Sequence, residues 1–240
     1  MSTPHSRRSP SLLDDPEAQG FTMSAGTFVL GTRPVRSARP AGVETRDGIA
    51  FRIIASISAR HIHVSRAVLD ATYGVGYELL PVKELSQPGQ YAAQEALTVV
   101  GPRGREMGGV RILGPCRSYT QVELAPTDAR QLQLEPLVIR ESGQLDGAQT
   151  VTLVGPAGRA LVAAAIRPTR HIHMSPAQAR EKGAEPNQRV RVRIGGAAGI
   201  VFDNCLIRVN ERYHLDLHLD TDDANAAGLV GGEWVDVLRG

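Results

Sequence analysis

Cysteine is scarce in this chain, because only Cys116 and Cys205 occur among its 240 residues. Small secreted domains that rely on disulfides carry many more cysteines for their length, so this pair does not make a disulfide framework. A single structural disulfide is the less favoured alternative. The scarcity favours a reducing, intracellular compartment.

Charge of one sign and long hydrophobic runs are missing as well. The 27 Lys and Arg residues nearly balance the 25 Asp and Glu residues, which leaves a formal net charge of +2. No basic block marks a nucleic-acid binder, and scattered arginines suit a small anion better than a polyanion. No apolar run reaches the roughly 18 residues of a membrane span. The chain also lacks, after Arg7 and Arg8, the long apolar region that a secretory signal requires. We expect neither nucleic acid nor a membrane as a partner.

Several common catalytic motifs are also absent. The sequence has no Walker-type glycine-rich loop, no dinucleotide fingerprint and no Gly-x-Ser-x-Gly elbow. Neither cysteine has a histidine near it in sequence, so a cysteine nucleophile has little support unless the fold brings the two residue types together.

Residues 1–45 differ in composition from the rest of the chain. Ser, Pro, Arg, Thr and Gly dominate there, and several prolines interrupt any long element. We expect a flexible N-terminal extension, or alternatively a docking peptide that folds on a partner.

Short β-type runs bounded by Gly and Pro follow from residue 49 onward. Helical signals are few and short, and each begins with Ser or Thr in an N-cap position: Ser65–Tyr73, Ser175–Lys182 and Thr221–Ala227. The pattern predicts a mainly β fold, a barrel or sandwich with small helices.

An internal repeat indicates two related modules. Residues 59–65, Ala-Arg-His-Ile-His-Val-Ser, return at 169–175 as Thr-Arg-His-Ile-His-Met-Ser, with five of seven positions identical. A second pair of segments, 122–129 and 217–224, sets Glu123 opposite His218. We therefore predict two homologous small β-barrel domains with short capping helices, over residues 46–145 and 146–240.

Histidine is concentrated in these repeats. His5 lies in the extension, and the other six histidines are His61, His63, His171, His173, His214 and His218. Residues i and i+2 of a strand share a face, so each His-Ile-His motif presents two imidazoles side by side and turns its isoleucine toward the core. Paired imidazoles suit a borderline metal such as zinc.

A third ligand stands at equivalent positions in the two halves. A catalytic zinc usually has three protein ligands and one open position. The repeat predicts His61, His63 and Glu123 for one ion, and His171, His173 and His218 for another. A single His-x-His is more often an exposed strand pair, but two copies with a matched third ligand favour metal binding.

Four further side chains have two interpretations each. On a strand, His214 and Asp216 share the face of His218, and Asp216 either orients a ligand imidazole or is solvated; for His214 a supporting or structural role is the default. Arg117 shares the face of Glu123 on a continuous strand and offers a fork for phosphate, or is a surface arginine. Arg111 precedes Arg117 by six residues, but Gly114-Pro115 interrupts the strand; it too either contacts an anion or is a surface arginine, and for each arginine taken alone the surface interpretation is favoured.

Arg60 and Arg170 begin the two histidine motifs. Their repetition suggests a structural role in the module as much as a catalytic one.

Together these motifs resemble the PduL-type phosphate propanoyltransferases. The likeness covers about residues 48–240 and rests on Arg-His-Ile-His-x-Ser twice, Arg117-Ser-x-Thr-Gln-Val-Glu123, and His214-x-x-x-His218-x-Asp-Thr-Asp-x-Ala-Asn225. It implies a two-domain β-barrel enzyme with two zinc ions. Such an enzyme interconverts acyl-CoA plus phosphate with acyl phosphate plus CoA, typically inside bacterial microcompartments.

The resemblance also implies roles for individual residues. The six ligands above become the family's metal ligands, and Arg117 becomes its phosphate-binding catalytic arginine. Positions that contact coenzyme A correspond to Ile57, Ser58, Ala59, Arg103, Arg111 and Asn225. At position 59 the family commonly has Asn, a change that matters little if only the backbone contacts CoA.

Location and partners follow from the same resemblance. The extension resembles an encapsulation peptide, which implies shell or core proteins as partners and the microcompartment lumen within the cytoplasm as location. A homo-oligomer is expected, although no residue pattern specifies its size. The preferred acyl group is open, since propanoyl and acetyl differ by one methylene, worth only about 1–3 kcal/mol in an apolar pocket.

Two other functions compete with this one. A cupin-like metal oxygenase also uses His-x-His and a Glu on a barrel, but the Glu is expected about four residues later, where this chain has Ala67 and Ala177. A non-enzymatic, zinc-stabilised scaffold component is the other alternative, with the extension as its docking arm.

Overall fold

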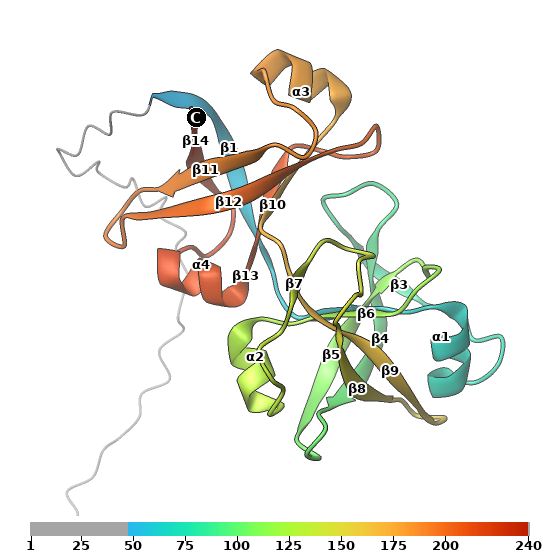
Figure 1. Cartoon of the computed structure of the whole chain (residues 1–240). Coiled ribbons are helices and arrows are strands. Elements are labelled where there is room, and N and C mark those ends of the chain that lie inside the picture. Colours follow the sequence, from blue (N-terminus) through green and yellow to red (C-terminus); the bar gives the residue numbers. More distant parts are fainter. Residues whose placement is uncertain (1–47, 240) are drawn as a thin grey trace, which may run out of the picture. The chain divides into compact units, whose positions relative to one another are not determined.

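The computed structural model describes residues 48–239, which all lie in one compact unit (Figure 1). In chain order its elements are β1 (Ile49–Ser58), β2 (His61–His63), α1 (Arg66–Tyr73), β3 (Pro81–Glu84), β4 (Tyr91–Val100), β5 (Glu106–Gly114), β6 (Gln121–Glu123), α2 (Pro126–Gln131), β7 (Ile139–Arg140), β8 (Gln149–Val154), β9 (Arg159–Pro168), β10 (His171–Met174), α3 (Pro176–Lys182), β11 (Arg189–Ile194), β12 (Ile200–Val209), β13 (Asp216–Asp220), α4 (Thr221–Ala227) and β14 (Glu233–Leu238). The expected extension over 1–45 lies outside the described residues.

These strands form two closed barrels. The first closes in the order β4, β5, β2, β6, β9, β8, because β8 pairs with both β9 and β4. The second closes in the order β1, β13, β10, β12, β11, β14. In both, the His-Ile-His strand lies between one parallel and one antiparallel neighbour. The predicted mainly β fold, with two homologous barrels and short helices, is confirmed.

The barrels do not follow the expected division into 46–145 and 146–240. Strand β1 pairs with β13 and β14 of the second barrel, whereas β8 and β9 complete the first. Figure 1 shows the blue β1 among the orange and red strands. The first strand of each repeat therefore belongs to the other barrel, and the boundary is corrected accordingly. The first barrel is continuous over residues 59–168, and the second combines 48–58 with 169–239.

Each barrel has its own hydrophobic core. Ile62 and Ile172 are completely buried and belong to separate apolar clusters, as the alternation of the His-Ile-His strands predicts. Because each isoleucine points into its barrel, the histidines on either side of it point outward. The same alternation that builds the two cores thus places two imidazoles of each repeat on the barrel surface.

The short helices begin where their caps predict, with one exception. Ser65 accepts a hydrogen bond from the Val68 amide, and Ser175 accepts one from the Gln178 amide. Helix α4 is capped by Asp220, whose carboxylate accepts from the Asp223 amide, so Thr221 is its first residue and not its cap. Helix α2 was not expected from the sequence. It occupies the repeat position equivalent to α4.

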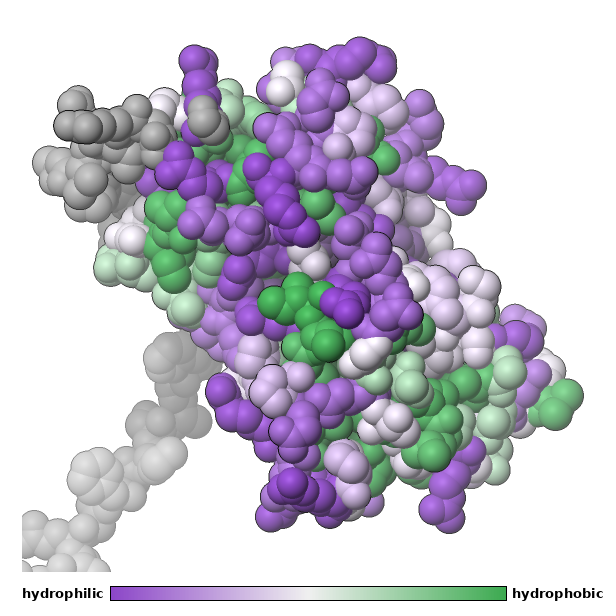
Figure 2. Space-filling model, in the orientation of Figure 1, coloured by the Kyte–Doolittle hydropathy of each residue, from purple (hydrophilic) through white to green (hydrophobic). Residues whose placement is uncertain are grey.

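No helix within residues 48–239 is long and apolar enough to cross a membrane. On the face seen in Figure 2, hydrophobic residues form separate patches among hydrophilic ones. Large exposed apolar side chains such as Val75, Leu161 and Trp234 belong to different elements or loops.

Candidate metal centres and anion pocket

The first predicted ligand set comes together where β2 and β6 pair. His61 lies directly opposite Glu123 in the antiparallel register, and His63 follows on the same face of β2. The His61 Nε2 and Glu123 Oε2 atoms are 3.5 Å apart, and all three side chains are buried. One potential ligand atom from each of these residues lies within 4.8 Å of the others. We call this group the first cluster.

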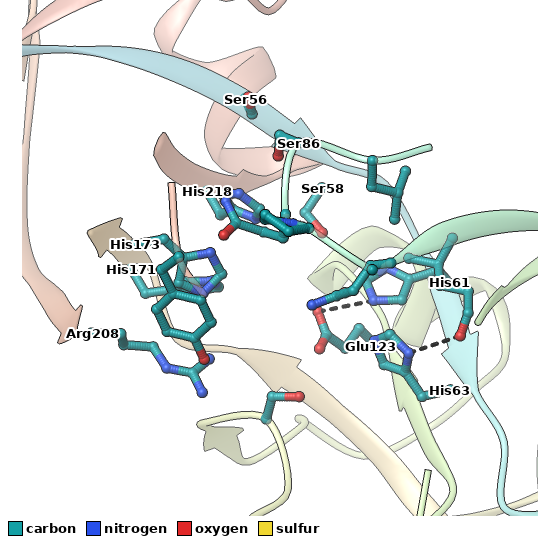
Figure 3. Close-up of a pocket in the computed structure, with 18 of the residues that line it drawn as sticks. Ser56, Ser58, His61, His63, Ser86, Glu123, His171, His173, Arg208 and His218 are labelled. Atoms are coloured by element: carbon teal, nitrogen blue, oxygen red, sulfur yellow. Dashed lines mark hydrogen bonds and ion pairs between the residues drawn. The ribbon is translucent and has the colours of Figure 1, made fainter. Parts of the chain in front are cut away.

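The second predicted set forms in the same way between β10 and β13. His171 lies opposite His218, and His173 shares their face. The three ring centroids are 4.6–5.0 Å apart, and the ligand atoms again lie within 4.8 Å of one another. We call this group the second cluster. Figure 3 shows the two clusters on opposite sides of one pocket.

Backbone carbonyls determine which nitrogen several imidazoles present. The Nδ1 atoms of His61, His63 and His171 lie 2.9, 3.1 and 2.7 Å from the carbonyl oxygens of Ala59, Leu113 and Thr169. Each Nδ1–H therefore donates to the backbone, which leaves Nε2 unprotonated and free for a metal.

His173 has an unusual environment for a buried histidine. Its side chain is 6% exposed, yet within residues 48–239 neither ring nitrogen has a hydrogen-bond partner. An unpaired buried polar group costs roughly 1–3 kcal/mol, and a bound cation would remove that cost. The residues present therefore fit a metal ion at the second cluster.

Burial keeps the imidazoles neutral, as metal ligation requires. Burial and then the neighbouring His218 lower the pKa of His171 to about 3. Burial is also the main cause that lowers the pKa of His173, and the neighbouring His171, His218 and Arg208 lower it further. The pKa of His63 falls well below its usual value, first through burial, then through His61 and Arg117. All three rings are uncharged at neutral pH.

Each third ligand is held by the side chain two residues before it. The Gln121 amide donates to Glu123 Oε1 at 2.6 Å and is supported by Ser142 and Gly143. Asp216 Oδ2 accepts from His218 Nε2 at 3.1 Å, so the nitrogen that His218 presents to the cluster is Nδ1. Of the two interpretations of Asp216, the structure favours the orienting one.

A pocket of about 750 Å³ lies between the clusters and is open to solvent. Both clusters line it, together with Ser56 to Arg60 at the C-terminal end of β1, the loop 85–90 and several arginines: Arg111, Arg117, Arg208 and Arg212. The combination of metal-ligand sets and guanidinium groups suits an anionic substrate.

Arg117 lies in the pocket, although the argument that predicted it is wrong. Residues 118–120 interrupt the strand, so Arg117 does not share a continuous face with Glu123. Instead it bridges to Ser65 and donates to the Tyr119 and Ser142 hydroxyl groups at 2.8 and 2.9 Å. These contacts aim its guanidinium near the first cluster.

Arg208 was not expected from the sequence. It lies opposite His173 in the pairing of β10 with β12, and its guanidinium stands over the Tyr213 ring. Tyr213 in turn stacks on His173 at 4.1 Å. Within residues 48–239 no hydrogen bond or ion pair engages the Arg208 side chain. No motif marked this residue, because its place depends on the pairing of β12 with β10.

The positions predicted to contact coenzyme A fall into two groups. Four of them line the pocket: Ile57, Ser58, Ala59 and Arg111. Arg103 lies outside it, exposed in the turn between β4 and β5 and 4.0 Å from Glu135. Asn225 is also outside it, exposed on α4. The structure does not bring these two together with the other four.

The remaining residues singled out in the sequence have structural contacts. Arg60 donates to Asp128 at 2.6 Å, and Arg170 forms two bonds to Asp223 at 2.7 and 2.8 Å, so both tie a histidine strand to the helix that follows the third ligand. His214 is exposed and precedes β13, so it does not share a strand with His218.

Neither cysteine is placed as a nucleophile. Both are free thiols, and neither lines the pocket. Burial raises the pKa of Cys205 to about 12, which keeps it protonated.

The region that carries both clusters is similar to known proteins. The family model for phosphate propanoyltransferase matches residues 54–230. A phosphate propanoyltransferase of Thermotoga maritima is 46% identical over 78% of this chain and 89% of the relative. Those of Leptotrichia buccalis and Enterococcus faecalis are 43% and 44% identical, over 73% and 76% of this chain and 82% and 86% of the relatives. The matched region includes both clusters.

Proposed function

This chain belongs to the phosphate propanoyltransferase family, and we propose that it is a zinc-dependent phosphate acyltransferase. It interconverts propanoyl-CoA and phosphate with propanoyl phosphate and CoA. We include acetyl-CoA as a second substrate, because one methylene changes binding in an apolar pocket by only about 1–3 kcal/mol. The observation that carries the proposal is the pair of three-ligand clusters facing one arginine-lined pocket.

We assign one zinc ion to each cluster. Neutral imidazoles, a carboxylate and three protein ligands per site are typical of catalytic zinc. The unpaired nitrogens of His173 support the assignment for the second cluster. When bound, such an ion supplies Lewis-acid polarisation of a carbonyl or phosphate oxygen.

The side chains of the pocket position the two substrates. Arg117 holds phosphate beside the first cluster, and Arg208 extends the positive field beside the second. Ile57, Ser58, Ala59 and Arg111 form the CoA side of the pocket, and contacts from Arg103 and Asn225 remain predictions for more distant parts of CoA.

The reaction needs no protein nucleophile. A phosphate oxygen attacks the thioester carbonyl carbon, the C–O bond forms, and the C–S bond breaks to release the CoA thiolate. The guanidinium groups offset the negative charge that the attacking phosphate brings into the pocket. The protonated state of buried Cys205 agrees with direct transfer.

The decisive experiment measures phosphate-dependent CoA release from propanoyl-CoA and acetyl-CoA, together with the metal content of the same preparation. We expect activity and about two zinc ions per chain, and loss of activity together with zinc at the second site in His173→Ala. Full activity in a zinc-free His173→Ala protein would falsify the scheme. His214→Ala, outside both clusters, is the matched control and keeps metal and activity.

The same preparation tests the two competing functions. A cupin-like oxygenase requires iron and consumes oxygen, and a scaffold component binds CoA no better than an unrelated nucleotide. Family membership supports the transferase over both.

We further propose that the N-terminal extension directs the enzyme to the lumen of a bacterial microcompartment, through shell or core proteins. Support comes from the course of β1, whose first residue, Ile49, lies at the opposite end of the strand from the pocket residues Ser56 to Ser58. The point where the extension joins the described part of the chain is therefore at the strand end away from the pocket. Residues 1–47 fused to a fluorescent protein are expected to co-localise with shells, whereas the chain without them is expected to keep activity.

Light scattering tests the expected homo-oligomer.

A further inference from the structure

The loop over residues 85–90, between β3 and β4, connects the first barrel to the second. The Gln87 side chain is 4% exposed and forms two hydrogen bonds with the backbone of His214. Its Oε1 accepts from the His214 amide at 3.2 Å, and its Nε2 donates to the His214 carbonyl at 3.3 Å. Both backbone groups of a residue just before β13 are therefore held by the other barrel.

The neighbouring residue reaches the support of a metal ligand. Ser86 donates from Oγ to Asp216 Oδ2 at 3.0 Å, the same oxygen that accepts from His218 Nε2. Ser56 of β1 donates to the other oxygen, Oδ1, at 2.8 Å. Figure 3 shows Ser56 and Ser86 beside each other near His218. The carboxylate thus has its direction set from both sides.

The loop itself has a defined shape. The Leu85 amide donates to the Gln90 carbonyl at 3.0 Å, and the Gln90 amide donates to the Gln87 carbonyl at 3.2 Å. Gly89 adopts a φ of 75°, which favours glycine, and so allows the tight return into β4. A loop closed in this way holds Ser86 and Gln87 in place.

The first cluster is supported differently. Gln121, the equivalent of Asp216, is held by Ser142 and Gly143, which lie in the loop before β8 of the same barrel. Among the described residues, the second cluster alone therefore draws support for its third ligand from the other barrel.

We propose that Gln87 and Ser86 are positioning residues through which the first barrel sets the orientation and tautomer of His218. The inference rests on the proposed two-metal function, and it adds a dependence of the second metal site on the loop of the first barrel. Partners that orient a ligand typically change metal affinity about 10- to 100-fold.

The test measures chelator-induced zinc release from the full-length, zinc-loaded protein. His218→Ala and Glu123→Ala identify which release phase belongs to which cluster. We expect Ser86→Ala and Gln87→Ala to accelerate release from the second cluster by about 10-fold and to leave the first phase unchanged. Ser142→Ala is the matched control, which accelerates the first phase only, and Ser86→Thr restores the wild-type rate because it keeps the hydroxyl.

A second measurement needs no metal. In chelated protein, the nitrogen chemical shifts of the His218 ring report its tautomer, which we expect to be Nε2–H in the wild type and mixed in Gln87→Ala and Ser86→Ala. Equal acceleration of both release phases, or unchanged release with an unchanged tautomer, overturns the inference. A wild-type chain that binds no zinc instead refutes the metal function, and the tautomer measurement then decides the positioning role alone. Ser86→Ala removes only one hydroxyl group, from an exposed residue, and serves if Gln87→Ala does not fold.

Discussion

In each half of the molecule, the side chain two residues before the third ligand matches the chemistry of that ligand. Glu123 is an acceptor, and Gln121 supplies an N–H donor; His218 has an N–H to donate, and Asp216 supplies an acceptor. A duplicated strand has thus diverged at two positions together. The strand register is the same in both halves. The supporting residues differ because an acceptor ligand needs a donor beside it, and a donor ligand needs an acceptor.

Arg208 provides a prediction about phosphate binding. Replacing it with Gln removes a guanidinium that lines the pocket, and charge-assisted hydrogen bonds are worth about 1.5–3 kcal/mol. We expect Arg208→Gln to raise the KM for phosphate about 10- to 100-fold in steady-state assays. Arg189→Gln on β11 is the control, because the residue is exposed and, within residues 48–239, its side chain donates a hydrogen bond to the Asn204 carbonyl and to no other group. An unchanged phosphate KM in Arg208→Gln argues against its role.

The buried histidines predict a pH dependence for the metal-free protein. The lowered folded-state pKa values of His63, His171 and His173 mean that the unfolded chain, with His pKa near 6.5, binds more protons below that pH. Stability is therefore fully present above about pH 6.5 and is lost as pH falls toward about 3 for His171.

Each such histidine contributes up to about 1.4 kcal/mol per pH unit in that window. Urea unfolding in the presence of chelator at pH 7.5 and 5.5 measures the loss. Between pH 7.5 and 5.5, His173→Gln is expected to lose less free energy of unfolding than the wild type. His214→Gln, at an exposed position, is expected to lose as much as the wild type. Equal losses in all three proteins contradict the prediction.

At the scale of elements, arginine–aspartate pairs connect the histidine strands to the helices. Asp223 of α4 accepts from Arg170 and also from Arg167 of β9, a strand of the first barrel. Asp128 of α2 has one such arginine, Arg60. The repeated arginine before each His-Ile-His motif is therefore explained by structure, and α4 additionally links the two barrels.

This difference predicts unequal costs of substitution. Asp223→Ala leaves Arg170 without its carboxylate partner and removes one of the two carboxylates that Arg167 contacts, since Arg167 keeps Asp220 at 2.8 Å. The substitution is expected to reduce the free energy of unfolding by about 1.5–3 kcal/mol. Asp128→Ala is expected to cost less, because the Arg60 side chain is 48% exposed and regains water. Glu181→Ala, at an exposed position of α3, is expected to change the free energy of unfolding by about 0.5 kcal/mol or less. Denaturant titration measures all three, and an Asp128→Ala cost equal to that of Asp223→Ala contradicts the prediction.

At the scale of the whole molecule, strand exchange determines which fragments can fold. Residues 59–168 contain every strand of the first barrel, whereas residues 146–240 lack β1, which closes the second. Without β1, the edges of β13 and β14 lose their partners and core residues Ile53 and Ala55 are missing.

We therefore expect a 59–168 fragment to fold and to bind one zinc ion, and a 146–240 fragment to remain unfolded. Joining residues 48–58 by a linker to 169–239 is expected to restore folding of the second barrel. Circular dichroism and metal analysis of the three polypeptides measure this. A folded 146–240 fragment contradicts the strand assignment.

The sequence by itself determined that the protein consists of two related barrels, which six residues form the clusters, and that the isoleucine of each His-Ile-His motif points into a core. It could do so because strand alternation and a matched duplication are regularities that can be read from the sequence itself. Only the tertiary structure decided that β1 closes the second barrel, that Arg208 faces the pocket and that the loop 85–90 supports His218. These features depend on how distant segments pair and dock, which no local periodicity encodes. Arg117 lies between the two cases, since its motif was recognisable but its position comes from a bend in the chain and not from a shared strand face.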